Sequence, residues 1–299
     1  LIPVIESMGK GLMGTPLVST VLAAEPIRRA GGVAEEDVLE DISAGCAATV
    51  AYLDGSDWGG TNAGVAVDAS GVLSGSKFMV PDAAHAMWIA VVGSNAEGDS
   101  VIALVAGSDV AAQAQASHAL IDLTKRATTI DFTGVKAQRV LSGDKVTSAI
   151  RDYLLIGALL TAAEAVGSTS ACLAGIVDYL KTRKQFGKLI GSFQALKHPT
   201  VDIYVGMEHS RSLVYHASSE IDDGPLSVEA EVACRMAKAK ASDTIQYAGD
   251  RSVQFHGGFG FTWECDSSLF IRRAAWSQQQ FGDAMHHRKR LAPLLLDRE

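Results

Sequence analysis

The second half of the chain follows a helical period almost without interruption. Four long segments predict helices with short connections between them, at roughly 148–185, 193–222, 226–255 and 266–296. In the first segment, apolar residues recur at steps of three and four, which gives the helix a broad buried face. Four long helices joined by short loops predict an antiparallel four-helix bundle. We therefore expect residues 146–299 to form one helical domain.

The first half of the chain changes period twice. Residues 41–145 alternate apolar and polar positions between Gly, Asp, Ser and Asn turns, which predicts a compact β-domain, either a barrel or a sandwich. Residues 1–40 carry apolar residues at helical spacing broken by Gly and Pro, which predicts short helices. The expected fold class is α+β, with a partial N-terminal helical region, a middle β-domain and the C-terminal bundle.

Composition narrows the class of protein. A net charge of −8 argues against a nucleic-acid or anionic-membrane binder, because both need a basic face. The four cysteines lie far apart and predict neither a zinc site nor a disulfide framework. The most apolar run, at 153–163, is too short to span a bilayer, and no secretory signal is visible. We expect a cytoplasmic protein, although the chain opens at Leu1 without Met, which leaves open a segment before it.

A glycine-rich stretch follows the third expected helix. QFHGGFGF, residues 254–261, places three glycines in four positions. Glycine permits positive φ and close approach to the backbone, and a bare turn needs only one, so the extra glycines indicate a ligand against the main chain. The motif is not the dinucleotide-binding fingerprint, which follows a strand with different spacing. Considered alone, it is better explained as a helix C-cap and tight turn.

A basic stretch joins the first two expected helices. In YLKTRKQFGKLIGSFQ, residues 179–194, Arg183 is suited to pairing with a phosphate, and Gln194 to hydrogen bonding with a ribose or a heterocycle. Considered alone, this stretch is better explained as a basic helix end that answers the helix dipole.

Taken together, the two motifs resemble those of the acyl-CoA dehydrogenase family. RKQFGKLIGSFQ lies at one helical hairpin and QFHGGFG follows at the next. Similar to further segments of that family are EPIRRAGG, SGSKFMVPDAAHAMWIAVV and TTIDFTGVKA. The resemblance spans essentially the whole chain. It implies an N-terminal helical domain, a middle β-domain and a C-terminal four-helix bundle, associated as tetramers.

The same resemblance implies FAD shared across a subunit interface. In that arrangement the flavin ring lies on one subunit's β-domain, and the ADP half is held by the bundle of its neighbour. The cofactor-binding residues that the resemblance implies for this chain are Arg183, Gln185, Phe193, Gln194, Gln254, Gly257 and Gly258.

The catalytic base of the family is missing from both of its expected positions. Family members use a carboxylate to remove the acyl α-proton while hydride passes to the flavin. Many carry it as Glu in a Y-E-G-T segment, where this chain has Phe281, and others on the first bundle helix, at about Gly157. Neither residue accepts a proton. Asp283 is expected to point elsewhere. Glu164 is a weak candidate base; the interpretation we favour is an ion pair with a Lys or Arg of a neighbouring helix.

The β-domain departs from the family where it would meet a flavin ring. Ala51 and Tyr52 replace the Thr-Glu of the family's V-T-E-P segment, while Ser56 and Asp57 are kept. The residues 79–82, Met-Val-Pro-Asp, stand where W-I-T-N would be, and the proline offers neither a hydroxyl nor a backbone N–H.

These departures favour a non-catalytic subunit of a heteromeric, α2β2 acyl-CoA dehydrogenase. The chain would complete the partner's FAD site, while the partner supplies the base and the contacts to the flavin ring. The resemblance implies CoA thioesters from steroid side chains or related lipids as substrates, and an electron-transfer flavoprotein as acceptor. Two alternatives stay open: a self-sufficient homotetrameric dehydrogenase with Glu164 as its base, and a degenerate member that binds CoA esters or a protein partner.

Overall fold

The computed structural model describes residues 1–31, 36–55, 58 and 64–297, and it divides into two compact units. The β unit comprises Gly14–Ile156 with Asp223–Pro225, and the bundle unit comprises the rest. The long helix α4 (Asp144–Thr182) begins in the β unit and continues into the bundle unit. The predicted domain boundaries lie at residues 40 and 145. The compact units instead divide at residue 14, where the β unit begins, and at residue 156, where its main segment ends inside α4.

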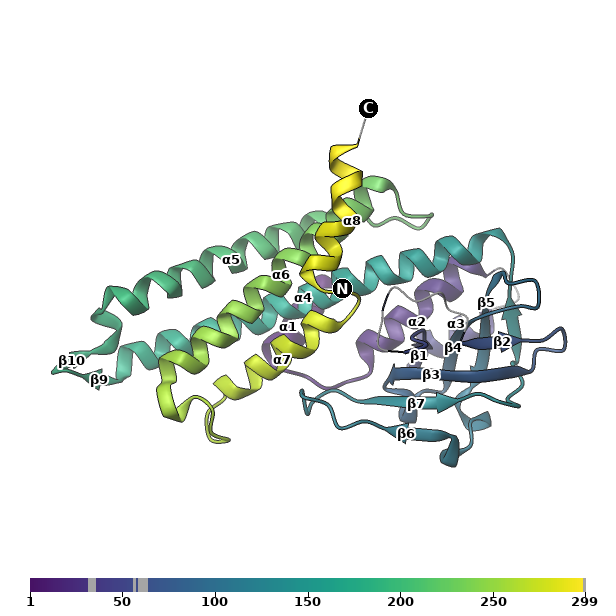
Figure 1. The fold of residues 1–299 in the computed structure, drawn as a ribbon, viewed down its shortest axis with the longest axis horizontal. Helices are drawn as coiled ribbons and strands as arrows, with labels where there is room; N and C mark the ends of the chain where they lie inside the picture. The colour runs from purple at the N-terminus through teal and green to yellow at the C-terminus, as the bar shows by residue number, and fades with distance from the viewer. Residues whose placement is uncertain (32–35, 56–57, 59–63, 298–299) are drawn as a thin grey trace. The chain divides into compact units, whose positions relative to one another are not determined.

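The β unit is built on a mixed eight-stranded sheet (Figure 1). The strands follow the order β6-β7-β3-β2-β4-β5-β8, and β1 pairs with β4 in parallel. Helices α2 (Leu17–Ala30) and α3 (Glu36–Ser43) pack on each other, and α2 also packs on β1. The strands are β1 (Ala48–Ala51), β2 (Val65–Val67), β3 (Leu73–Pro81), β4 (Trp88–Ser94), β5 (Ser100–Ala106), β6 (Gln115–Ser117), β7 (Ala127–Asp131) and β8 (Arg139–Leu141).

Most of these strands lie in the segments whose alternating period predicted them. In β4 and β5 the central residues are buried on both faces, and their antiparallel register runs from Trp88↔Ala106 to Ser94↔Ser100. The short edge strand β6 was not predicted, because its sequence QAS has no apolar alternation and its side chains are largely exposed. Strand β3 carries an irregularity between Lys77 and Val80, where Met79 adopts a φ of 53°.

The bundle unit consists of α1 (Ile2–Lys10), the C-terminal part of α4, α5 (Gln194–Ser219), α6 (Val228–His256), α7 (Ser267–Gln279) and α8 (Ala284–Leu296). Helix α6 packs against α5, α7 and α8. Glycines let α1 approach α4 closely, because a Cβ at Gly9 would collide with the carbonyl oxygen of Glu164, and one at Gly167 with that of Glu6. The hydroxyl of Ser168 then donates a 2.8 Å hydrogen bond to the carbonyl of Gly9.

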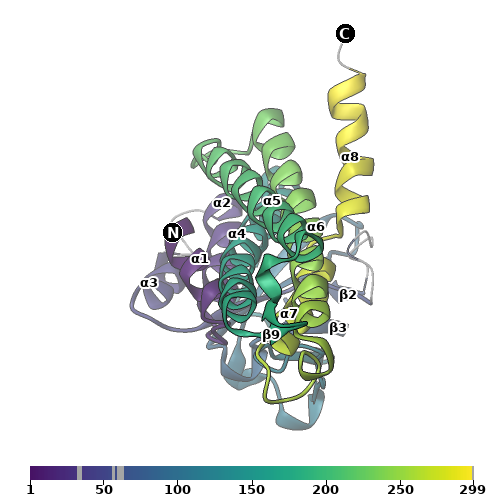
Figure 2. The ribbon, with the colours of Figure 1, turned by 90° about the vertical axis from the view of Figure 1, so that its left-hand side faces the viewer.

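The fourth predicted helix is two helices, which corrects the single segment expected at 266–296. Helix α7 ends at Gln279 and α8 begins at Ala284. Phe281 and Gly282 between them adopt φ values of 55° and 91°, and two successive positive φ values interrupt a right-handed helix. Figure 2 shows α8 leaving the direction of the bundle helices.

Helix α4 is long and apolar enough to cross a bilayer, judged by length and composition alone. In the structure, 83% of its qualifying window is buried, as in the core helix of a folded domain. The apolar run at 153–163 lies inside this helix. The α+β class and the helical C-terminal region are thus confirmed.

Candidate functional site

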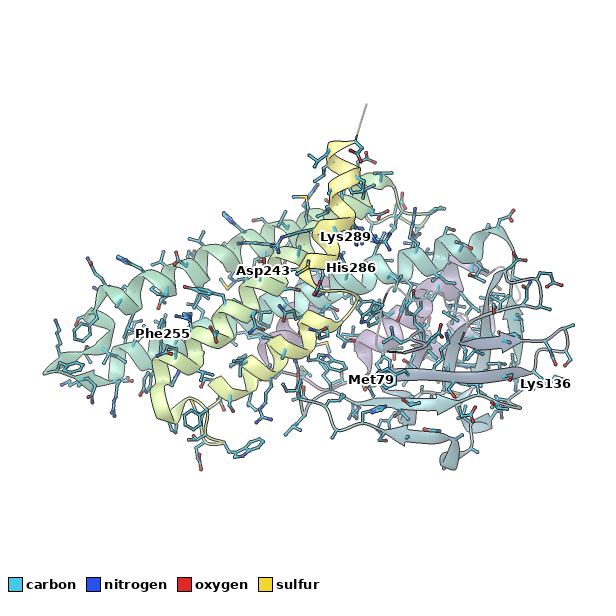
Figure 3. The ribbon with its side chains drawn as sticks, viewed as in Figure 1. Met79, Lys136, Asp243, Phe255, His286 and Lys289 are labelled. Atoms are coloured by element: carbon cyan, nitrogen blue, oxygen red, sulfur yellow. The ribbon has the colours of Figure 1, made fainter. Side chains whose placement is uncertain are left out.

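A pocket of about 500 Å³ lies in the bundle unit, beside the hairpin at the left end of the bundle in Figure 1. The end of α4, the hairpin of β9 (Lys184–Gln185) and β10 (Lys188–Leu189), the start of α5 and the end of α6 contribute to it. Aromatic side chains form much of its wall, namely Tyr179, Phe186, Phe193 and Phe255. Figure 3 labels Phe255 near the end of α6.

Five of the seven residues predicted to bind the cofactor line this one pocket. They come from two motifs separated in sequence and are Arg183, Gln185, Phe193, Gly257 and Gly258. The other two lie beside it: Gln194 is the first residue of α5, Gln254 lies in the last turn of α6, and both are exposed. Their roles in binding stay predictions, but the two motifs meet as the sequence implied.

Arg183 is the cation of the pocket. Its side chain is exposed, and within the described part of the chain no carboxylate or carbonyl pairs with its guanidinium. The backbone around it is fixed, because its N–H donates to the carbonyl of Tyr179 and its own carbonyl accepts from Ile190, both at 2.9 Å. A guanidinium presents a planar fork of donors that matches a phosphate or carboxylate.

The structure explains two of the three glycines after α6, Gly257 and Gly260, but not Gly258. Gly257 adopts a φ of 62°, which disfavours any side chain. Gly260 packs on α6, because a Cβ there would lie 2.5 Å from the carbonyl oxygen of Val253. Gly258 has no positive φ, and a Cβ on it would meet nothing within 4 Å. Nothing in the described protein requires Gly258, so a ligand that approaches the backbone there would account for it.

The hairpin between α4 and α5 presents an aromatic side chain at the surface. Phe186 and Gly187 form its turn with φ values of 54° and 76°, the pair of positive values that a type I′ hairpin requires. Phe186 is 90% exposed. The centroids of the Phe186 and Phe193 rings lie 6.1 Å apart, and the two rings are nearly perpendicular. Lys188 places its ammonium 4.4 Å from the centre of the Phe193 ring.

Seven further residues line this pocket and were not among the predicted ones: Tyr179, Phe186, Ile190, Ala195, Leu196, Phe255 and His256. Tyr179 and His256 stack with ring centroids 4.2 Å apart, and Phe255 is buried beside them. The Nδ1 atom of His256 lies 2.8 Å from the carbonyl of Ser252. Tyr179 stands one helical turn before Arg183, and His256 directly precedes Gly257. Tyr179, Phe255 and His256 all stand inside the two quoted motifs, and their aromatic rings beside Arg183 and Gly257 were the signal that could have found them.

The two positions expected to carry a base lie in contact with each other. A Cβ on Gly157 would lie 2.5 Å from both Cδ1 and Cζ of Phe281, so the phenyl ring rests on the bare backbone of α4. The contact supports the correspondence drawn from sequence, because both positions reach one point of the bundle. Neither Gly157 nor the Phe281 side chain is able to accept a proton.

The nearby carboxylates have other partners. Arg273 on α7 donates from Nη1 to Oε1 of Glu164 at 2.9 Å, and both side chains are buried. This is the ion pair favoured from sequence. Asp283 caps α8 by accepting a 2.7 Å hydrogen bond from the backbone N–H of His286. No group of three or more His, Cys, Asp or Glu side chains within the described residues is placed to hold a metal ion.

In the β unit, the residues expected from sequence to replace the family's flavin contacts make hydrogen bonds and ring contacts within the protein. Tyr52 is buried and stacks on Trp58 with centroids 5.8 Å apart. The fully buried Lys77 donates to the carbonyl of Tyr52 at 2.9 Å and also pairs with Asp54.

The segment at 79–82 is held in the same way. The carbonyl of Pro81 accepts from the hydroxyl of Thr49 at 2.7 Å, and Asp82 accepts from Ser19 at 2.8 Å and pairs with Arg126. Ser56 and Asp57 lie outside the described residues.

The sequence of the chain is similar to known proteins. Residues 147–293 match the sequence model of the acyl-CoA dehydrogenase C-terminal domain. Acyl-CoA dehydrogenase IpdE2 of Mycolicibacterium smegmatis is 38% identical over 134 residues, which cover 45% of this chain and 40% of that protein. Residues 147–293 are thus an acyl-CoA dehydrogenase C-terminal domain, and the chain is similar to acyl-CoA dehydrogenases.

Solved structures share the fold over the whole chain. The ChsE4-ChsE5 complex from Mycobacterium tuberculosis matches with a TM-score of 0.85 at 23% identity, covering 100% of this chain and 80% of that chain. The Tcur3481-Tcur3483 steroid ACAD matches with a TM-score of 0.84 at 24% identity, covering 98% and 79%. The sequence match to IpdE2 spans less than half of that relative's own length.

Proposed function

We propose that this chain is the non-catalytic subunit of an α2β2 acyl-CoA dehydrogenase, and that its bundle pocket holds the ADP half of the partner's FAD. One observation carries the proposal. Two motifs from different helical hairpins meet in a single pocket, where the described residues neither pair Arg183 with a carboxylate nor account for Gly258, while Phe281 and Gly157 stand at the two base positions.

The pocket residues fit a dinucleotide. The guanidinium of Arg183 is available to a pyrophosphate, and the open face of Gly258 lets a ligand approach the backbone of the loop that follows α6. The aromatic wall formed by Tyr179, Phe186 and Phe193 offers surfaces on which an adenine ring can stack. Bound FAD supplies the hydride acceptor of the reaction; this chain binds and orients its nucleotide half.

The proposed roles of the two subunits follow from the residues that stand at the base and flavin-contact positions of this chain. With Phe281 at the base position, the α-proton has to be removed by a carboxylate of the partner. Among the described residues, Tyr52 stacks on Trp58 and Pro81 has no backbone N–H, so neither supplies the donor that the family places at its position. The heteromeric arrangement finds support in the fold shared with the ChsE4-ChsE5 complex.

Substrate, acceptor and location belong to the same proposal. A steroid ACAD shares the fold, which supports a CoA thioester from a steroid side chain as the substrate. An electron-transfer flavoprotein is the proposed acceptor, and the cytoplasm the proposed location. The homotetrameric alternative needs Glu164 as a base, and its buried pairing with Arg273 disfavours that role.

Flavin content tests the proposal. The chain is purified alone and with a co-expressed acyl-CoA dehydrogenase from the same genome, and bound flavin is measured by its visible absorbance. We expect none with the chain alone and one FAD per pair of unlike chains. Flavin bound by the chain alone and bleached by an acyl-CoA would refute the non-catalytic role.

Arg183→Ala adds a matched comparison within that complex. It should lower the flavin retained after gel filtration. Lys181→Ala removes an equally exposed cation at the end of α4 that does not line the pocket, and should leave flavin content unchanged. Equal retention in both variants would remove Arg183 from the site.

A further inference from the structure

The turn between α7 and α8 has an unfavourable backbone held by buried polar groups. Phe281 is a bulky residue with a φ of 55°, a conformation that persists only where the surroundings impose it. Two buried side chains, Lys238 from α6 and His287 from α8, reach the carbonyl oxygens of this turn. Figure 3 marks the neighbouring His286 at the start of α8.

Lys238 is 1% exposed, which is unusual for a lysine. Its ammonium lies 2.9 Å from the hydroxyl of Ser242, 3.0 Å from the carbonyl of Ser277 and 2.9 Å from the carbonyl of Gly282. A fourth oxygen, the carbonyl of Gln278, lies 3.4 Å away, so the three N–H donors of the ammonium are all supplied with acceptors. The lysine thus ties α6 to the last turn of α7 and to the turn beyond it.

His287 holds the adjacent carbonyl. Its Nε2 atom donates to the carbonyl oxygen of Phe281 at 3.0 Å, and the side chain is 2% exposed. Burial, and then the positive charges of Lys238 and Arg235, lower the pKa of His287 to about 3. The imidazole is therefore neutral at physiological pH. The Nδ1 atom has no hydrogen-bond partner within the described residues, which leaves the Phe281 carbonyl as the polar contact of this ring.

We propose that Lys238 is a positioning residue: with His287 it clamps the α7–α8 turn, and the clamped turn keeps the Phe281 ring on Gly157. The inference rests on the proposed function, since it takes this turn as the position where a catalytic subunit presents its base. The Phe281 ring, held on Gly157 by the clamped turn, then occupies the space at the base position. The position therefore lacks a carboxylate and is also filled by an ordered side chain.

The contact between Phe281 and Gly157 provides the assay. In Gly157→Ala the new methyl group collides with the ring, so the loss in Tm reports how firmly the ring is held. The substitution is made in the full chain in four backgrounds: wild type, Phe281→Ala, Lys238→Met and Lys240→Met. Lys240 lies on the same helix and is half-buried, and the described residues offer its ammonium no hydrogen bond, so it serves as the matched control.

We expect Gly157→Ala to lower the Tm by several degrees in the wild type and in Lys240→Met. In Phe281→Ala the loss should vanish, and in Lys238→Met it should shrink by at least half, because a released turn lets the ring move aside. An undiminished loss in Lys238→Met would overturn the clamp, and an undiminished loss in Phe281→Ala would overturn the ring contact itself.

A second variant at Lys238 covers the case in which the first one does not fold. If Lys238→Met does not fold, Lys238→Gln replaces it, because the amide keeps part of the hydrogen bonding. In that background the loss in Tm caused by Gly157→Ala should be smaller than in the wild type. A loss in Tm equal to that of the wild type would again overturn the clamp. Because the assay measures stability and not flavin, its outcome is independent of the flavin content that tests the proposed function.

Discussion

The buried pair of Glu164 and Arg273 allows the two competing roles of Glu164 to be separated. The Arg273 side chain is 0% exposed and that of Glu164 is 6% exposed, at an N–O distance of 2.9 Å. Removing one partner of a buried ion pair leaves an uncompensated charge, which typically costs ~3–5 kcal/mol. Glu164→Leu should therefore lower the free energy of unfolding by about that amount, whereas Glu164→Leu combined with Arg273→Leu should recover much of the loss.

Urea unfolding of the full chain measures the stability, and turnover of the co-purified complex measures the role in catalysis. Glu164→Gln retains a hydrogen-bond acceptor for Arg273 and should leave kcat nearly unchanged. A kcat reduced by several decades in Glu164→Gln, with unfolding unaltered, would refute the structural role and make Glu164 the base. Full additivity of the two leucine substitutions would refute the coupling between the two side chains.

Two further predictions concern the glycine loop and the buried lysine. Gly258→Leu should leave the Tm unchanged, because its side chain enters open space, yet reduce the flavin retained by the complex; Gly260→Ala should lower the Tm, because its Cβ would lie 2.5 Å from the carbonyl oxygen of Val253. Flavin content unaffected by Gly258→Leu would contradict the ligand approach. Burial lowers the pKa of Lys238 from 10.5 to about 7, against the opposing effect of Asp283. The unfolded chain then binds this proton more tightly between pH 7 and 10.5, so this group makes stability rise with pH across that window. Lys238→Met should flatten that rise, as measured by urea unfolding at several pH values, and an identical pH profile in the variant would contradict the shift.

Much of the fold could be predicted from sequence because its signals are local. The helical period after residue 146 and the continuous apolar runs of β4 and β5 depend on neighbours along the chain. The break between α7 and α8 escaped prediction, because the apolar period continues across Phe281 and Gly282. Phe281 and Gly282 have positive φ values, and their carbonyl oxygens accept hydrogen bonds from His287 on α8 and from Lys238 on α6, 44 residues before Gly282.

The candidate site divides in the same way. The sequence by itself determined that an arginine stands at the end of the first long helix and a glycine-rich loop at the end of the third, and that no carboxylate occupies either base position. Only the tertiary structure decided that these motifs share one pocket, that Gly258 is the glycine left open, and that Phe281 lies on Gly157. It also decided that Glu164 pairs with Arg273, 109 residues away. Such contacts depend on how each helix is rotated about its axis and packed, and a local pattern of residues does not specify that rotation.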